Sequence, residues 1–270
     1  MVTRRRRSTY LNEQGGTATL AGIHTRTVPN LADGTLDIPT VLRCLRDDDA
    51  HYARVKVVAV ENTHNDCGGL ALPLAFLDSI KAAVSAKGVA LHMDGARAGN
   101  AAVALGVTLE RTCRAADTVS ICLSKGMGAP IGSLLCGPRP FVDRARRARK
   151  ALGGGWRQAG IVAAAGLMAL EGFEETVRRD HVLATRLAQA LRGAKGVKVE
   201  AMPATNMVFF ESEESDGGGL VERLAGAGVL VFGGRGPLKT RVRAVVHRDV
   251  SEEDIDFAAE AIAKAAAAHS

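Results

Sequence analysis

Three apolar runs of this sequence end in polar residues that could do chemistry. Lys125 follows "VSICLS", Asp94 follows "ALHM", and Glu61 follows "VVAV". A lysine amine that loses its proton can attack a carbonyl carbon, and a carboxylate can hold a cationic ring nitrogen. An aspartate and a lysine placed in this way after successive strands are the arrangement expected for pyridoxal phosphate held as a Schiff base.

Each of these residues also has an ordinary structural interpretation. Lys125 could be a solvated lysine at a strand end, and Asp94 could be a turn or cap residue. The glycines of "KGMGAPIG", which begins at Lys125, favour a ligand site because glycine lets the backbone approach a ligand closely. Arg97, three residues after Asp94, could pair with that carboxylate or reach an anionic oxygen of the ligand.

Strands and helices must alternate in the first part of the chain to place these residues. Short apolar runs predict strands within residues 55–62, 89–97, 117–125 and 132–137, and "LDSIKAAVSAKG" predicts a helix over 77–88. This alternation predicts an α/β fold with a mostly parallel sheet flanked by helices. Ligands of such sheets bind beyond the carboxyl ends of the strands, so the same residues mark the predicted site.

The order of elements changes toward the end of the chain, which predicts two domains, 1–190 and 191–270. Helices are predicted from about 140 to 191. The smaller second domain is predicted to be α+β, with strands within 197–201, 206–212 and 240–246 and helices near 220–228 and from 251 onward. Ser251 is expected to cap the last helix.

Composition limits the class of protein. The 270 residues can bury one large or two medium cores. No apolar run reaches about 18 residues, and the start has no apolar signal core, so no membrane partner is predicted. The five cysteines lack the CxxC spacing of metal sites, which favours reduced thiols, a cytoplasmic location and no bound metal.

The positive net charge suggests a nucleic-acid-binding protein as a further hypothesis, which we rank last among the functions considered. The net charge is +6, and arginines gather in "RRRR" and "RARRARK". Aromatic residues for base stacking make up only 4% of the chain, and 29 acidic residues offset the basic ones. We therefore expect no nucleic-acid partner and interpret most of "RARRARK" as a solvated helix face.

Longer segments resemble a known family. "ENTHNDCGG", "LHMDGARAGNAAVALG", "DTVSICLSKGMGAPIGSLLCG" and "RKALGGGWRQAG" look like successive blocks of the low-specificity L-threonine aldolases, and the resemblance covers about residues 8–260. It implies the fold of type I pyridoxal-phosphate enzymes, as in aspartate aminotransferase, with the cofactor bound by residues 1–190. It also implies a homodimer or homotetramer.

The resemblance implies roles for the strand-end residues. Lys125 would form the internal aldimine, Asp94 would keep the ring nitrogen protonated, and Arg97 would lie beside the phenolic oxygen of the ring. Ser124 would contact the cofactor as well. Arg157 matches a basic residue with phosphate or interface contacts.

Two further residues match groups that would bind the substrate. Arg243 matches the arginine that clamps the substrate carboxylate, with Arg241 as the neighbouring alternative. His51 matches a histidine near the substrate hydroxyl, although a solvated loop histidine is an equal interpretation. A histidine or a water molecule would act as the general base.

The activity implied is a retro-aldol cleavage of L-threonine or L-allo-threonine to glycine and acetaldehyde. Two alternatives stay open. One is another β-hydroxy-amino-acid aldolase or a β-eliminating lyase on the same scaffold. The other is a truncated, catalytically impaired family member.

Two departures from the family lead to expectations. The resemblance begins abruptly, "MVTRRRR" matches nothing in the family, and Ser8 stands at the position of the ring-stacking histidine. A shortened start is expected to weaken the anchoring of the cofactor phosphate. Ala98 and Gly99 are smaller than the residues usual after the arginine, which predicts a void or a loosened loop.

Overall fold

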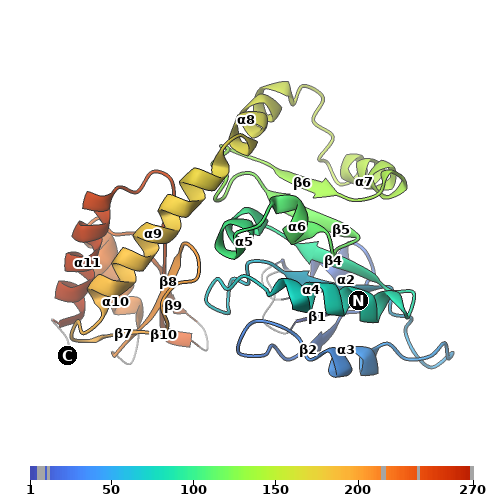
Figure 1. Cartoon of the computed structure of the whole chain (residues 1–270), viewed down its shortest axis with the longest axis horizontal. Helices are drawn as coiled ribbons and strands as arrows, with labels where there is room; N and C mark the ends of the chain where they lie inside the picture. The colour runs from blue at the N-terminus through green and yellow to red at the C-terminus, as the bar shows by residue number, and fades with distance from the viewer. Residues whose placement is uncertain (5–9, 11–12, 214–216, 236–237, 268–270) are drawn as a thin grey trace. The chain divides into compact units, whose positions relative to one another are not determined.

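The computed structural model describes residues 1–4, 10, 13–213, 217–235 and 238–267. Ser8 and most of the first arginine run lie outside these described residues. The chain divides into two compact units, Met1–Phe173 and Glu174–Ser270 (Figure 1). None of the helices described is long and apolar enough to cross a membrane.

A six-stranded sheet forms the centre of the first unit, in the order β2-β1-β3-β4-β5-β6. All neighbours are parallel except β5 and β6, so the predicted mostly parallel sheet is confirmed. The strands are β1 (Val2–Arg4), β2 (Arg26–Val28), β3 (Val57–Glu61), β4 (Ala90–Asp94), β5 (Thr118–Cys122) and β6 (Ser133–Cys136).

Helices connect and flank these strands. They are α2 (Gly16–Thr19), α3 (Ile38–Cys44), α4 (Leu74–Ser85), α5 (Ala98–Leu105), α6 (Leu109–Cys113), α7 (Arg139–Ala151) and α8 (Gly160–Leu170). In α4, Leu77, Ile80 and Val84 recur on one face and are all fully buried. The arginines of α7 are exposed, which confirms the solvated face expected for most of "RARRARK".

The start of the chain forms an element that the sequence did not predict. Strand β1 lies inside the sheet, between β2 and β3, and Val2 and Thr3 are fully buried. Three residues are too few to show the alternation by which a strand is recognised. Residues 2–4 therefore contribute directly to the sheet that carries Asp94.

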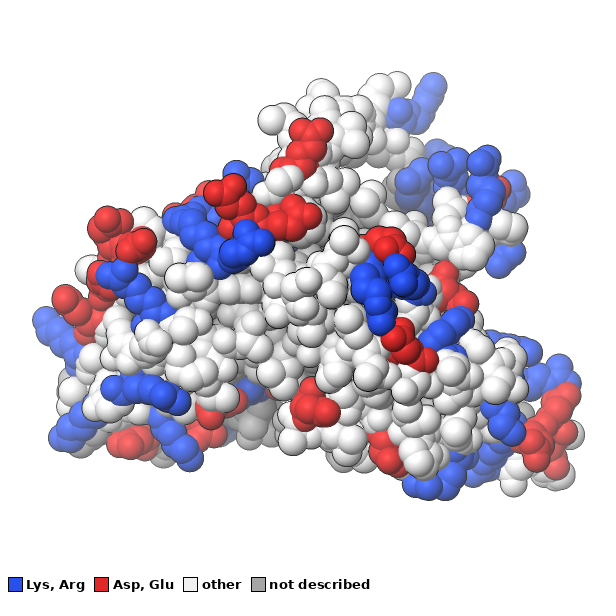
Figure 2. All heavy atoms as spheres, viewed as in Figure 1, with Lys and Arg blue, Asp and Glu red and all other residues white. Residues whose placement is uncertain are grey.

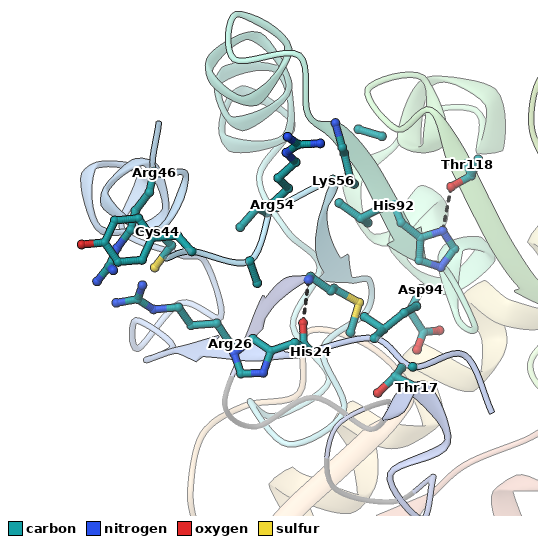
Figure 3. A pocket seen from close by; sticks show the side chains of 18 of the residues that line it. Thr17, His24, Arg26, Cys44, Arg46, Arg54, Lys56, His92, Asp94 and Thr118 are labelled. Atoms are coloured by element: carbon teal, nitrogen blue, oxygen red, sulfur yellow. Dashed lines mark hydrogen bonds between the residues drawn. The ribbon is translucent and has the colours of Figure 1, made fainter. Parts of the chain in front are cut away.

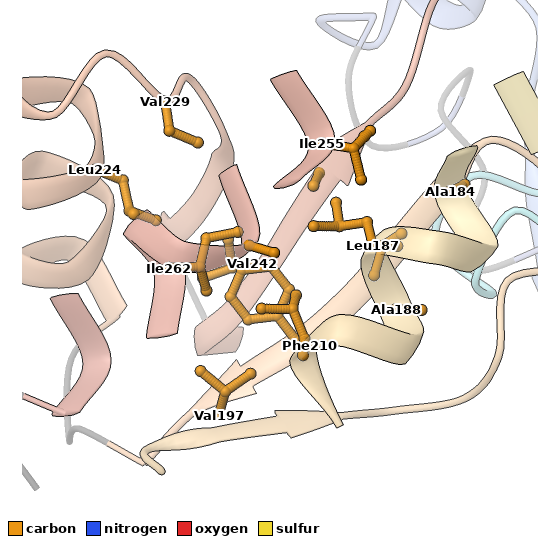
Figure 4. Close-up of a cluster of buried hydrophobic side chains, with 14 of the residues drawn as sticks. Ala184, Leu187, Ala188, Val197, Phe210, Leu224, Val229, Val242, Ile255 and Ile262 are labelled. Atoms are coloured by element: carbon orange, nitrogen blue, oxygen red, sulfur yellow. The ribbon is translucent and has the colours of Figure 1, made fainter. Parts of the chain in front are cut away.

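The second unit is a smaller α+β unit, as predicted. An antiparallel sheet runs in the order β7-β8-β10-β9 and packs with three helices. The elements are α9 (Phe173–Leu191), β7 (Val197–Val199), β8 (Met207–Ser212), α10 (Gly217–Gly226), β9 (Phe232–Arg235), β10 (Leu238–Val245) and α11 (Glu252–Ala267). Phe210, Val242 and Ile262 lie together in its core (Figure 4).

The units divide earlier than the predicted boundary at residues 190/191. Leu183, Leu187 and Leu191 of α9 belong to the hydrophobic core of the second unit. Helix α9 therefore groups with the second unit, and the division falls at Phe173/Glu174. The predicted cap of α11 is confirmed, because Ser251 Oγ accepts a hydrogen bond from the Asp254 backbone N–H at 3.1 Å.

A buried carboxylate distinguishes α9. Asp180 is fully buried, and neither carboxylate oxygen has a hydrogen-bond partner among the described residues. Burial raises the pKa of Asp180 from 3.8 to about 6, although the nearby positive charges of Arg179, His247 and Arg248 oppose this shift. The ionised form of Asp180 is therefore disfavoured in the folded state.

Asp180→Asn is expected to stabilise the protein at neutral pH. An acid whose folded-state pKa is raised contributes most to stability below its unfolded pKa of 3.8, and that contribution is lost as pH rises to about 6. Above that range, the amide should raise the free energy of unfolding by up to about 3 kcal/mol. Urea unfolding at about pH 7.5 and about pH 4 measures this gain, which should nearly vanish at the lower pH.

The neighbouring residues provide controls for this measurement. Burial lowers the pKa of His181 to about 4, but that contribution is present in both proteins and cancels in their difference. Asp249 has a highly exposed side chain, so Asp249→Asn should change stability little. An Asp180→Asn variant no more stable than the parent at neutral pH would contradict the account of this carboxylate.

Candidate functional site

The carboxyl ends of three strands lie side by side in the first unit. Glu61 of β3 pairs with Asp94 of β4, and Asp94 pairs with Ser120 of β5. The turn after Asp94 passes close to β5, where the Gly95 N–H donates to the Ser120 carbonyl at 2.8 Å. A Cβ on Gly95 would lie 3.0 Å from that oxygen, so glycine suits this position.

A cavity of about 880 Å³ opens on this face of the sheet (Figure 3). Ala90, His92 and Asp94 alternate along β4 and line it, whereas Leu91 and Met93 are fully buried. Four basic residues contribute to the lining, Arg26, Arg46, Arg54 and Lys56, and the last two lie just before β3, at its amino end. The lining thus includes one strand-end carboxylate and several cations, and the volume is within the size range of ligand pockets.

Arg97 lies next to Asp94, at the N-cap of α5. Burial lowers the pKa of Arg97, and negative charge acts in the opposite direction, most strongly from Glu61 and less from Cys122, Asp94 and Asp66. A guanidinium stays charged in proteins, so Arg97 is a fixed cation beside the carboxylate. The sequence did not indicate that Glu61 is the strongest of its counter-charges.

The loop after β5 carries Lys125. The Gly128 N–H donates to the Lys125 carbonyl at 2.8 Å, and the Leu123 N–H donates to the Gly132 carbonyl at 3.0 Å. A Cβ on Gly126 would lie 2.7 Å from Asn100 Oδ1, so this position requires glycine. Both Ser124 and Lys125 are exposed, so this chain by itself does not provide the desolvated environment expected for the lysine amine.

The void predicted beside Arg97 is not present. Ala98 is fully buried in α5. A Cβ on Gly99 would lie 2.9 Å from Cε2 of Phe173 and 3.1 Å from Cε of Met127. Two side chains from later in the sequence therefore fill the space that a larger residue would need, and the expectation of a void was wrong.

His51 and Asp94 line the same cavity, although they are 43 positions apart in sequence. His51 is exposed, and its Nδ1 lies 2.7 Å from Oδ1 of Asp49. Arg157 is also exposed, in the segment between α7 and α8. The alternation of β4 could have indicated His92 as a further lining residue, since it lies two positions before Asp94.

Arg243 belongs to the second unit. Its guanidinium lies 5.2 Å from the ring centroid of Phe232. The neighbouring candidate, Arg241, donates to Oε2 of Glu200 at 2.8 Å and lies 4.1 Å from the ring centroid of Phe209. Arg241 is therefore engaged within its own unit.

The fold is that of known pyridoxal-phosphate lyases. A threonine aldolase from Leishmania major superposes with a TM-score of 0.82 at 19% identity, over 97% of this chain and 76% of that one. An L-allo-threonine aldolase assigned in Listeria monocytogenes gives a TM-score of 0.79 at 20% identity, over 98% and 74%. These likenesses establish the fold class.

Sequence comparison narrows the class to a family. Residues 1–215 match the family model described as beta-eliminating lyase. A probable low-specificity L-threonine aldolase 2 of Arabidopsis thaliana is 40% identical over 255 residues, which are 92% of this chain and 71% of the relative. The low specificity L-threonine aldolase of Escherichia coli K12 is 42% identical over 246 residues, 91% and 71%. The chain belongs to the low-specificity L-threonine aldolase family of beta-eliminating lyases.

The described residues fit pyridoxal phosphate. The cofactor combines a basic ring nitrogen, an anionic phosphate and an aldehyde. Asp94 lines the cavity and can pair with the nitrogen, and basic residues of the same lining can attract an anion. Lys125, the candidate for the aldehyde, lies on the loop after the neighbouring strand β5 and is not among the residues that line this cavity.

Proposed function

We propose that this protein cleaves L-threonine and L-allo-threonine to glycine and acetaldehyde with pyridoxal phosphate. The observation that carries the proposal is Asp94, a carboxylate at the end of a central parallel strand that lines a cavity together with several basic residues. Relatives named low-specificity L-threonine aldolase, at 40% and 42% identity, support the substrate class.

Five residues of the first unit would hold the cofactor. Lys125 would bind its aldehyde carbon covalently, and Asp94 would pair with its protonated ring nitrogen. Arg97 would contact the phenolic oxygen, Ser124 would contact the cofactor as well, and Arg157 would contact the phosphate. When bound, the cofactor supplies an electron sink for the pair left behind when the Cα–Cβ bond breaks.

The chain's own residues would bind the substrate and move its proton. Arg243 would bind the substrate carboxylate, for which a guanidinium has a matching pair of donors. His51 would remove the β-hydroxyl proton. If Asp49 accepts from Nδ1, then Nε2 of His51 carries a lone pair and can act as the base.

A second reaction has specific support from the family model, which is described as beta-eliminating lyase. The two reactions give different products from threonine. Retro-aldol cleavage gives glycine and acetaldehyde, whereas elimination of water followed by hydrolysis gives 2-oxobutanoate and ammonia. A different β-hydroxy amino acid as preferred substrate would show as faster aldehyde release from that compound.

The purified chain with added pyridoxal phosphate tests these proposals directly. Bound cofactor should give visible absorbance that remains after gel filtration, and threonine should yield glycine and acetaldehyde in equal amounts. Formation of 2-oxobutanoate would favour the eliminating lyase. Bound cofactor without any product would favour the catalytically impaired member, and a chain that retains no cofactor would contradict the enzyme proposal.

We also propose that the protein is a homo-oligomer. Helix α8 has the sequence "GIVAAAGLMAL", without a single charge, and Figure 2 shows it as an uncharged area beside the basic residues of α7. Its Ile161, Leu167 and Met168 are 84%, 66% and 76% exposed. Apolar patches of this kind typically mark protein interfaces, and most soluble assemblies join identical chains.

The double substitution Ile161→Glu, Met168→Glu is expected to convert the assembly to monomers, because two carboxylates would have to be buried in the interface. Light scattering after gel filtration measures the mass. Leu20→Glu adds charge at another exposed apolar residue of the first unit and should leave the mass unchanged. A parent protein that is itself a monomer would rule out the proposed interface.

We also propose that the protein is located in the cytoplasm. None of the five cysteines forms a disulfide bond, and Cys44 is buried. Thiols that stay reduced suit a reducing compartment. Microscopy of the tagged protein in its own cells would test this location.

A further inference from the structure

The guanidinium of Arg243 lies over an aromatic ring of a neighbouring strand. Arg243 of β10 pairs directly with Phe232 of β9, and Cζ of the arginine is 5.2 Å from the centroid of the phenyl ring. A guanidinium within about 6 Å of a ring centroid is attracted by the face of the ring. The contact therefore joins the arginine proposed for the substrate carboxylate to a defined side chain of its own sheet.

A second pair of the same kind on this sheet serves as a comparison. The guanidinium of Arg241 lies 4.1 Å from the ring centroid of Phe209, and Phe209 is only 7% exposed. Phe232, in contrast, is 62% exposed, and a phenyl ring in water lacks the stabilisation that burial would give it. Phe209 is thus part of a packed interior, whereas Phe232 presents an open apolar surface next to a cation.

The geometry of a guanidinium gives this contact a function. A guanidinium that lies over a ring directs its N–H donors outward around its edge, where a carboxylate can accept from two of them. The ring also restricts the rotation of the long arginine side chain, and a restricted side chain loses less entropy when it binds a ligand.

We infer that Phe232 is a positioning residue that orients Arg243 for the carboxylate of the substrate. The contact distance, the direct pairing of the two residues across the strands and the exposure of the ring carry this inference. It rests on the proposed function, because it assigns Arg243 to the substrate carboxylate.

Steady-state kinetics of the holoenzyme test this role. Phe232→Leu keeps an apolar side chain but removes the ring, so KM for L-threonine should rise about three- to fivefold. The value of kcat should change less than about twofold, because the contact acts on binding. Phe232→Tyr keeps the ring and should behave like the parent. Phe257→Leu changes another exposed phenylalanine of the second unit and should leave KM unchanged.

Ligand binding shows whether the ring acts through the carboxylate. Glycine carries a carboxylate and glycinamide does not, and the absorbance of the bound cofactor can report the binding of either compound. Phe232→Leu should weaken the binding of glycine by about the factor by which it raises KM, and it should leave the binding of glycinamide unchanged. Equal weakening of both ligands would overturn the inference.

The outcomes separate the inference from the function on which it rests. If the parent cleaves threonine and Phe232→Leu has the KM and the glycine affinity of the parent, the role of Phe232 is refuted and the proposed function stands. In an Arg243→Gln background, Phe232→Leu should lower kcat/KM little further, and an equal loss there would show that the ring does not act through Arg243. If the parent retains no pyridoxal phosphate or forms no glycine, the proposed function fails, and the role of Phe232 toward the substrate fails with it.

Discussion

Lys125→Ala should abolish the visible absorbance of bound pyridoxal phosphate and reduce threonine cleavage by roughly 10³-fold or more. The lysine is the predicted covalent attachment point, and no neighbour on its loop offers another amine. The loop itself should survive, because its hydrogen bonds involve the backbone of Lys125 and not its side chain.

Absorbance spectra and initial rates of glycine formation measure this loss. Lys87→Ala removes an exposed lysine of the same unit, outside the loop, and should behave like the parent. Circular dichroism should show that both variants keep their secondary structure. A Lys125→Ala protein that retains the absorbance would remove this lysine from its proposed role.

Asp94→Asn should lower the rate of threonine cleavage by about 10²–10³-fold, which corresponds to about 3–4 kcal/mol of transition-state stabilisation. The amide fits the space but carries no charge, so it cannot keep a ring nitrogen protonated. The Asp94 backbone should keep its register with Glu61 and Ser120, because the β-ladder does not depend on the carboxylate.

Steady-state kinetics with threonine test this expectation. The effect should fall mainly on kcat, because the missing charge acts on the electrons released by bond breaking. Asp66→Asn provides a matched loss of one carboxylate, and it should change kcat far less. Parent-like kcat in Asp94→Asn would contradict the assignment of Asp94 to the cofactor.

The sequence predicted the sheet and its strand-end residues because buried parallel strands leave a strong signal. Glu61 follows the β-branched run "VVAV" and Asp94 follows "ALHM", and both are the last residues of their strands in the sheet. Strand β1 left no such signal, since three residues show no period and the arginines that follow it resemble a solvated segment.

The exposure of individual side chains and the contacts between them could not be predicted from the sequence in the same way. The engagement of Arg241 with Glu200 joins a side chain of β10 to one that directly follows β7. The exposure of Lys125 depends on how its loop packs against the rest of the unit. The predicted boundary between the units falls too late because the sequence of α9 shows only that it is a helix. It does not show that the buried residues of α9 pack into the core of the second unit. Such properties arise from tertiary contacts that a single sequence does not encode locally.

Gly99 and Phe173 are in close contact, so the space available to one residue depends on the size of the other. The aromatic ring occupies the space into which a side chain on Gly99 would extend. In related chains, the sizes of the residues at these two positions should therefore vary in opposite directions. A bulky residue at the position of Gly99 should occur with a small residue at the position of Phe173, and a small residue at the first position with a bulky residue at the second. Neither residue could be enlarged alone without displacing the start of α5, the helix that follows Asp94 and begins at Ala98, directly after its N-cap Arg97.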